Sequence, residues 1–225
     1  PRLGGPHGPY AQSERIARYE QALDRLLAAR RIFPCELSRK DLDGIASAPH
    51  AREGRTAPAI PRPRGLPPHW LRDLRAGRGA AVAVRFAVEP REIVFEDRVF
   101  GTVRERVADT TGDFVVRRRD GVFAYQLAVV VDDIEMEIDE VVRGADLLDS
   151  TARQIELIEA LGGARPAYAH VPLVRNVNGE KLSKRDSGLT LRSLRAAGVA
   201  ATQVVGYLAC SLGLVDRPLP CAPAD

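Results

Sequence analysis

The pentapeptide Lys181-Leu182-Ser183-Lys184-Arg185 is the segment whose residue types and spacing most clearly suggest chemistry. It holds two of the three lysines of a 225-residue chain that contains 30 arginines. An ammonium group on a flexible stem suits a point contact with a phosphate oxygen, whereas guanidinium is a wide planar fork. We interpret the segment as a loop that folds over a nucleotide and stabilises the charge of a leaving pyrophosphate. The alternative interpretation is a solvated surface loop.

The elements on either side of this pentapeptide must hold it in place. Residues 167–174 before it predict a strand, and two short helices over about 190–197 and 200–212 follow it. Further upstream, residues 139–142 predict another strand, and Ser150 is expected to cap the helix that comes next. This succession of strand, capped helix, strand and basic loop predicts an α/β fold with a partly parallel sheet.

The first part of the chain predicts a different arrangement of elements. Ser13 is expected to begin a helix of about 18 residues, and Pro34 ends its apolar pattern. From there to about Gly79 the many prolines predict a loop-like, irregular subdomain. Beyond it the apolar residues predict a buried segment over 123–131 and strands over 82–88, 93–95, 99–103 and 114–116.

Composition limits the classes of protein that this sequence can encode. With 45% hydrophobic and 28% charged residues, it is globular rather than disordered. No apolar run is long enough for a membrane span, and three cysteines suit no disulfide framework, so we expect a cytoplasmic protein. Residues 1–79 carry 15 basic and 8 acidic side chains, and residues 80–162 carry 10 and 18. Basic ends around an acidic middle indicate either contact with a polyanion or simply solvated faces.

The pentapeptide resembles the KMSKS-type signature of class I aminoacyl-tRNA synthetases, in the form typical of the glutamyl branch. The resemblance is densest over 113–188 and touches most of residues 9–214. It implies a Rossmann-like catalytic domain that lacks its N-terminal part and carries an inserted irregular α+β subdomain. The segments that carry it are Tyr10 with Gln12-Ser13-Glu14-Arg15, the tyrosine-bearing segment 123–133, Glu140–Asp146, Gln154 with Ala160-Leu161-Gly162, and His170–Leu173.

The same resemblance implies a division of the chain into four segments. The remainder of the first Rossmann half is expected over 1–33 and an inserted connective or acceptor-type subdomain over 34–112. The second Rossmann half, with the basic pentapeptide, is expected over 113–188. A C-terminal helical segment is expected over 189–225.

Within this branch the sequence is similar to the glutamyl-queuosine tRNA(Asp) synthetases, short paralogues of glutamyl-tRNA synthetase. Val129 stands where full synthetases usually have asparagine, and only about 40 residues follow the pentapeptide. The family activates L-glutamate with ATP, with Mg²⁺ expected, and transfers it to the queuosine base of tRNA(Asp). A monomer is expected. The alternatives are a catalytic-core fragment of a glutamyl-tRNA synthetase and a non-catalytic tRNA-binding remnant.

The resemblance also assigns site residues. Tyr125 and Arg143 would bind glutamate, although from the residues alone Tyr125 fits a core or rim position and Arg143 fits a pair with Asp146 or Asp132. Lys184 would contact the ATP phosphates, and Lys181 and Ser183 would complete the catalytic loop. Leu182 and Arg185 belong to the same ATP-binding segment. Asp132 and Asp133 suggest a metal site, but a structural or capping role is favoured.

Two departures from the family pattern lead to negative expectations. The HIGH-type segment is absent, with His7-Gly8 as its weak echo, so we expect little pyrophosphate exchange from these 225 residues alone. Zinc is predicted absent, because only Cys35 of the family's ligand set is present and Leu37 stands where the second cysteine would be. No other metal site is predicted.

Overall fold

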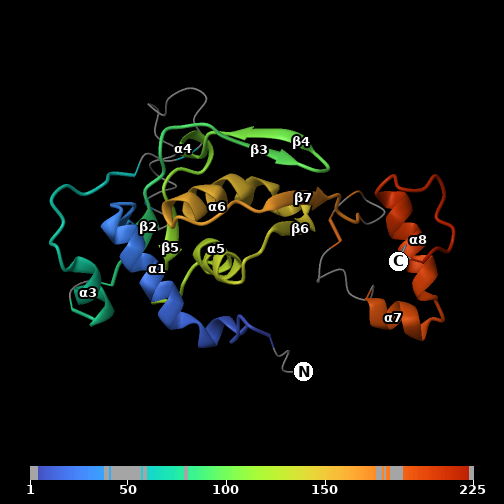
Figure 1. Cartoon of the computed structure of the whole chain (residues 1–225), viewed down its shortest axis with the longest axis horizontal. Helices are drawn as coiled ribbons and strands as arrows, with labels where there is room; N and C mark the ends of the chain where they lie inside the picture. The colour runs from blue at the N-terminus through green and yellow to red at the C-terminus, as the bar shows by residue number, and fades with distance from the viewer. Residues whose placement is uncertain are drawn as a thin grey trace. The chain divides into compact units, whose positions relative to one another are not determined.

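A computed structural model describes residues 5–37, 41, 57, 60–78, 81–175, 179, 181–182 and 190–222. The chain divides into two compact units (Figure 1). Unit 1 comprises Pro1–Val141 and Asp149–Tyr168, and unit 2 comprises Val142–Leu148 and Ala169–Asp225. The division into four segments stays a prediction.

A three-stranded antiparallel sheet forms one part of unit 1. Its strands are β1 (Ile32–Cys35), β2 (Ala83–Phe86) and β5 (Phe114–Arg117), in the order β1-β2-β5. Helix α1 (Ile16–Ala28) packs on α5 (Tyr125–Glu135), and each also contacts a strand of this sheet. The helix-spaced residues Leu23 and Leu26 are fully buried, as is Phe86 of the central strand.

A second sheet has the order β4-β3-β7-β6 and confirms the predicted α/β fold with parallel pairing. Strands β3 (Ile93–Asp97) and β4 (Gly101–Glu105) form an antiparallel hairpin, whereas β3 pairs in parallel with β7 (Ala167–Val171). Strand β6 (Glu140–Gly144) leads through a short turn, η2 (Ala145–Leu147), into α6 (Leu148–Ala160). Both β6 and β7 run from unit 1 into unit 2.

The prediction that residues 34–79 are loop-like is wrong at two points. Pro34 lies inside β1, where its partner is Val84. Proline has no backbone N–H to donate, and β1 tolerates it because it is an edge strand of its sheet. The second exception is α3 (Trp70–Arg75), a short helix that buries Leu71.

Neither predicted helix cap is correct. Ser13 belongs to the 3₁₀ turn η1 (Gln12–Glu14), and α1 begins only at Ile16, after Arg15. Ser150 lies inside α6 because the turn η2 has already started the helical path before it. Its hydroxyl is buried and accepts hydrogen bonds from the side chains of Gln126 and Arg153.

Two of the remaining helices confirm the predicted C-terminal pair. They are α7 (Leu191–Ala196) and α8 (Ala201–Ser211), and the Thr190 hydroxyl caps α7 through the Ser193 amide, 3.0 Å away. The short helix α4 (Val107–Thr110) lies between β4 and β5. In the described ranges no helix combines the length and the apolar character that a membrane span needs.

Candidate functional site

The basic pentapeptide starts on a hairpin-like loop of unit 2. The amide of Leu182 donates to the carbonyl of Val174 at 2.9 Å, and Arg175 and Lys181 form an isolated antiparallel bridge. Gly179 turns the chain with a φ of +80°, a conformation that glycine adopts without steric cost. Of the five predicted residues, the structure thus places Lys181 and Leu182, whereas Ser183, Lys184 and Arg185 lie outside the described residues.

Lys181 forms an ion pair with Asp146, in the turn after β6. The Lys181 ammonium holds the pKa of the Asp146 carboxyl below its usual range. Gly144 leaves room for the Asp146 carboxylate, because a Cβ there would lie 2.6 Å from Asp146 Oδ1 and 3.1 Å from Leu173 Cδ2. The pairing fixes the start of the basic loop to the end of β6.

Arg143 lies on β6 in the same unit and has a partner that the sequence did not reveal. Its Nε donates to Nε2 of His170 at 3.0 Å, and its Nη2 donates to the carbonyl of Leu147 at 3.4 Å. His170 is fully buried in β7. Because its Nε2 accepts, its ring proton lies on Nδ1. The one signal in the sequence was a histidine within the apolar run 167–171.

Tyr125 is the first residue of α5 in unit 1. Its side chain is half exposed, so the prediction of a buried segment over 123–131 is wrong at this residue. The next residue, Gln126, ties this end of the helix to α6. Its Nε2 donates to Ser150 Oγ at 3.1 Å, and its Oε1 accepts from Gln154 Nε2 at 2.8 Å. The phenol therefore stands on an anchored helix end, while Arg143 and Lys181 belong to unit 2.

Asp132 takes the structural role that was favoured for it. Its Oδ1 accepts from the Nε of Arg15 at 2.6 Å, and both of its oxygens lie 3.0 Å from the hydroxyl of Tyr19. Burial and the bond to Asp132 raise the pKa of Tyr19 to about 12. The Arg15 side chain is completely buried and also reaches Glu135 at 2.8 Å. These contacts join the start of α1 to the middle of α5.

Cys35 packs in an apolar cluster with Phe33 and Ala87, against which Leu37 also lies. Among the described residues no group of three or more His, Cys, Asp or Glu side chains is placed to hold a metal ion. A structural zinc site needs about four ligands, and the surroundings of this thiol do not fit one. The absence of zinc stays a prediction, and no step below depends on a zinc ion.

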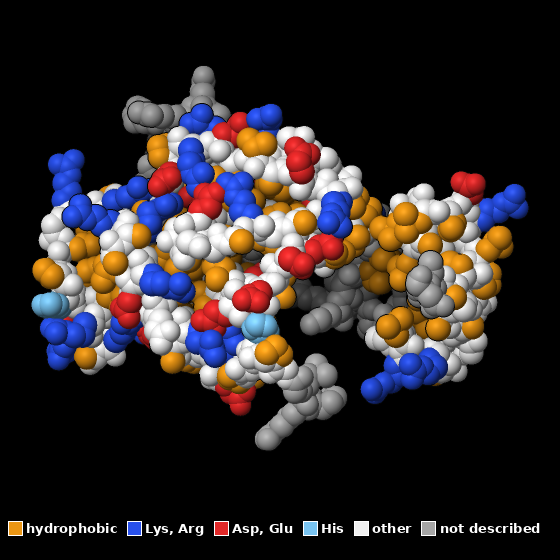
Figure 2. Space-filling model, viewed as in Figure 1, with side chains coloured by type: hydrophobic (Ala, Val, Ile, Leu, Met, Phe, Trp, Pro, Cys, Tyr) orange, Lys and Arg blue, Asp and Glu red, His pale blue; other side chains and the backbone are white. Residues whose placement is uncertain are grey.

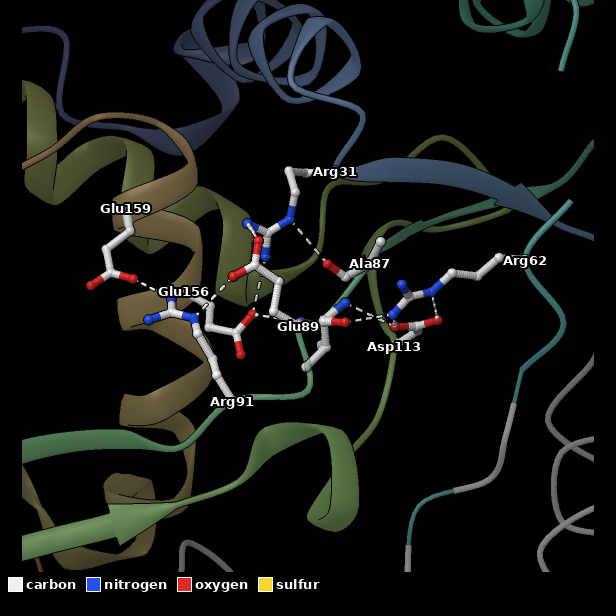
Figure 3. Close-up of polar contacts among 9 residues, drawn as sticks. Arg31, Arg62, Ala87, Glu89, Arg91, Asp113, Glu156 and Glu159 are labelled. Carbon is white, nitrogen blue, oxygen red and sulfur yellow. Dashed lines mark hydrogen bonds and ion pairs between the residues drawn. The ribbon is translucent and has the colours of Figure 1, made fainter. Parts of the chain in front are cut away.

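An ion-pair network joins the end of α1 to α6 in unit 1 (Figure 3). Arg31 donates to Glu89 at 3.0 Å, to Glu156 at 3.1 Å and to the carbonyl of Ala87 at 3.1 Å. Glu156 is fully buried, and its Oε1 has no hydrogen-bond partner among the residues that the structure describes. Burial therefore raises the pKa of Glu156 above its usual value of 4.5.

This raised pKa makes Glu156 a source of pH-dependent instability. A carboxyl whose pKa is higher in the folded state stabilises the fold at low pH, and that stability is lost as the pH rises above 4.5. Because glutamine does not titrate, we expect Glu156→Gln to become more stable relative to the unmodified chain as the pH rises from 4.5 to 7. Urea unfolding across this pH range measures the difference.

Glu159, one turn further along α6, provides the matched control. Burial alone would raise the pKa of Glu159, but hydrogen bonds from Arg165 and Arg91 lower it below its usual value. Its contribution is complete above about pH 4.5, so the stability difference caused by Glu159→Gln stays constant from there to pH 7. A constant difference for Glu156→Gln as well would contradict the prediction.

Comparison with known proteins gives relatives over the whole chain. A family model described as "tRNA synthetases class I (E and Q), catalytic domain" matches residues 3–214. The "Glutamyl-Q tRNA(Asp) synthetase" of Symbiobacterium thermophilum is 49% identical, and that of Nitratidesulfovibrio vulgaris is 44% identical. Each alignment covers 100% of this chain and 69% of the relative. The glutamate-tRNA synthetase of Elizabethkingia anophelis superposes with a TM-score of 0.71 at 26% identity, covering 93% of this chain and 47% of that one.

Proposed function

The chain belongs to the class I tRNA synthetases of the E and Q group, and from that membership we propose that the protein activates L-glutamate with ATP and transfers it to the queuosine base of tRNA(Asp). The observation that carries the choice of this branch is the 49% identity, over the whole chain, to a relative named for this reaction. The proposal describes a monomer that works in the cytoplasm, where its tRNA substrate is found.

In this proposal Arg143 and Tyr125 bind the glutamate substrate. A guanidinium pairs with a carboxylate through parallel N–H···O bonds, which fix direction as well as charge. The bond from Arg143 Nε to His170 supports this role, because it holds the guanidinium in one orientation. The half-exposed phenol of Tyr125 offers one donor and one acceptor to the amino acid.

The basic loop binds ATP in the same proposal. Lys184 contacts the phosphates, Lys181 and Ser183 complete the catalytic loop, and Leu182 and Arg185 belong to the same segment. Mg²⁺ accompanies ATP as its usual counterion. The ion pair between Lys181 and Asp146 supports a positioning role for Lys181. Asp146 lies two residues after the end of β6, the strand that carries Arg143, so the pair holds the basic loop next to that strand.

Transfer of glutamate to two forms of tRNA(Asp) tests the proposal. The protein expressed from its complete reading frame is incubated with ATP, radioactive L-glutamate, and tRNA(Asp) that carries or lacks queuosine. We expect acid-precipitable glutamate only on the queuosine-containing tRNA, because the unmodified tRNA lacks the acceptor base. Pyrophosphate exchange that depends on glutamate is measured in parallel.

Two other outcomes would reject it. Glutamate attached to tRNA that lacks queuosine would favour a glutamyl-tRNA synthetase core, which the likeness to the E. anophelis enzyme also supports. Tight, salt-dependent tRNA binding without any pyrophosphate exchange would instead favour a non-catalytic tRNA-binding protein.

A further inference from the structure

We propose that a pocket of unit 1, at the C-terminal end of α1, binds one unpaired nucleotide of an RNA. This proposal rests on the proposed function, which identifies the partner as an RNA. The pocket lies far along the sequence from the basic loop and contains none of the residues assigned above to glutamate or ATP.

The pocket has the size and the walls of a ligand site. Its volume is about 560 Å³, within the range of roughly 300–1,000 Å³ in which proteins bind small molecules. Pro67, Pro68 and Trp70 supply apolar surface. Trp70, the one tryptophan of the chain, is only half-buried, so a ring face can receive a ligand.

The charges of the pocket favour an anion. Two arginines, Arg30 and Arg62, line it together with apolar residues and glycine, and none of the described residues that line it is acidic. Figure 2 shows Lys and Arg side chains around an apolar area at the left of the view, where Figure 1 draws α3. A flat apolar wall beside a cation suits a stacked base with its phosphate, which is how proteins bind unpaired RNA nucleotides.

The two arginines have different roles. Arg62 is held by Asp113 through two bonds of 2.8 and 2.6 Å, and it also donates to the carbonyl of Val88 at 2.6 Å. Figure 3 shows this guanidinium held against the Asp113 carboxylate. Arg30 makes no side-chain hydrogen bond or ion pair with the part of the chain that the structure describes, and its side chain is exposed. Arg30 is therefore the group that is available to a phosphate.

The backbone at Arg30 gives independent support. The amide of Arg30 donates to Leu27 and that of Arg31 donates to Leu26, at 2.9 and 2.8 Å, which is the arrangement that ends many helices. The residue at this position has a φ of +56°, where glycine is strongly favoured over a residue with a Cβ. An arginine there adds strain to the fold, and binding through its side chain explains why it is present.

The intrinsic fluorescence of Trp70 tests the proposal directly. The protein is titrated with a single-stranded RNA hexamer without queuosine, with an RNA duplex, with AMP and with polyglutamate. We expect saturable quenching by the hexamer, at least about tenfold tighter than by AMP because flanking phosphates contact nearby arginines, and no quenching by the duplex. Tighter binding of AMP than of the hexamer would overturn the proposal. Quenching by polyglutamate equal to that by the hexamer would also overturn it, and would indicate that the pocket binds acidic peptides.

Two variants separate the pocket from general electrostatic attraction. Arg30→Gly is expected to weaken hexamer binding about tenfold or more while its melting temperature stays equal or rises, since the strained residue is gone. Arg72→Ala removes the same charge from an exposed position on α3 outside the pocket and is expected to weaken binding by less than about threefold. An equal loss in both variants would overturn the proposal.

The glutamylation assay on the same preparation separates this proposal from the function on which it rests. Glutamate transfer without quenching by the hexamer would overturn the pocket and leave the proposed function standing. Specific quenching that Arg30→Gly removes, in a protein without glutamate transfer, would support the pocket and reject the function.

Discussion

Asp132→Ala is expected to lower the free energy of unfolding by about 3–5 kcal/mol, because it leaves the buried guanidinium of Arg15 without its main counter-charge. The Arg15 side chain has no exposed surface, and the Asp132 side chain is 12% exposed. Water therefore cannot replace the carboxylate that is lost. Urea unfolding at pH 7, followed by circular dichroism, measures the change.

Three comparison variants divide this effect into its parts. Tyr19→Phe removes only the phenol's bonds to Asp132 and is expected to cost about 1 kcal/mol. Asp24→Ala removes an exposed carboxylate of α1 that pairs with Arg75 of α3, and it is expected to cost less than about 1 kcal/mol. The pair Arg15→Met with Asp132→Leu removes both charges and is expected to recover most of the loss. If Asp132→Ala cost no more than Asp24→Ala, the buried ion pair would not stabilise the fold.

The contacts of Asp132 also show which features could not be predicted from the sequence. Local patterns were sufficient for elements such as β2, in which three of the four residues are buried, and for α8, whose limits differ from the prediction by one residue at each end. Arg15 and Asp132 are 117 positions apart, and no periodicity connects them. The sequence indicated a structural aspartate but not its partner, because the fold alone brings α1 to α5.

The same limit explains the errors in the N-terminal part and the missed partner of Arg143. Pro34 is a reliable helix breaker, yet its compatibility with a strand depends on whether that strand lies at a sheet edge, which is a property of the assembled sheet. His170 reads as one polar residue in an apolar strand, and only the neighbouring strand supplies Arg143 as its donor. The basic loop was recognisable because its lysines are rare in this chain.

The largest expected effect on activity is that of Arg143→Ala, which we expect to lower kcat/KM for glutamate in pyrophosphate exchange by about 100-fold. Two charge-assisted hydrogen bonds to a carboxylate, at about 1.5 kcal/mol each, correspond to this factor. Arg143→Lys keeps the charge but loses the planar fork and the Nε–H that His170 accepts, so we expect it to recover only a small part of the loss. Exchange is measured on the protein expressed from its complete reading frame.

Substitution of His170 distinguishes recognition by Arg143 from a general effect on the fold. In the proposed function His170 positions Arg143, so His170→Leu is expected to raise KM for glutamate by about tenfold while kcat stays within about twofold. His170→Gln, whose amide oxygen can accept from Nε of Arg143, is expected to restore most of the affinity. A fall in kcat without a change in KM, in variants that keep the melting temperature of the unmodified protein, would show that Arg143 does not bind glutamate. An equal KM for the leucine and glutamine variants would show instead that the buried ring only fills space, because the two differ chiefly in the acceptor that they offer to the guanidinium.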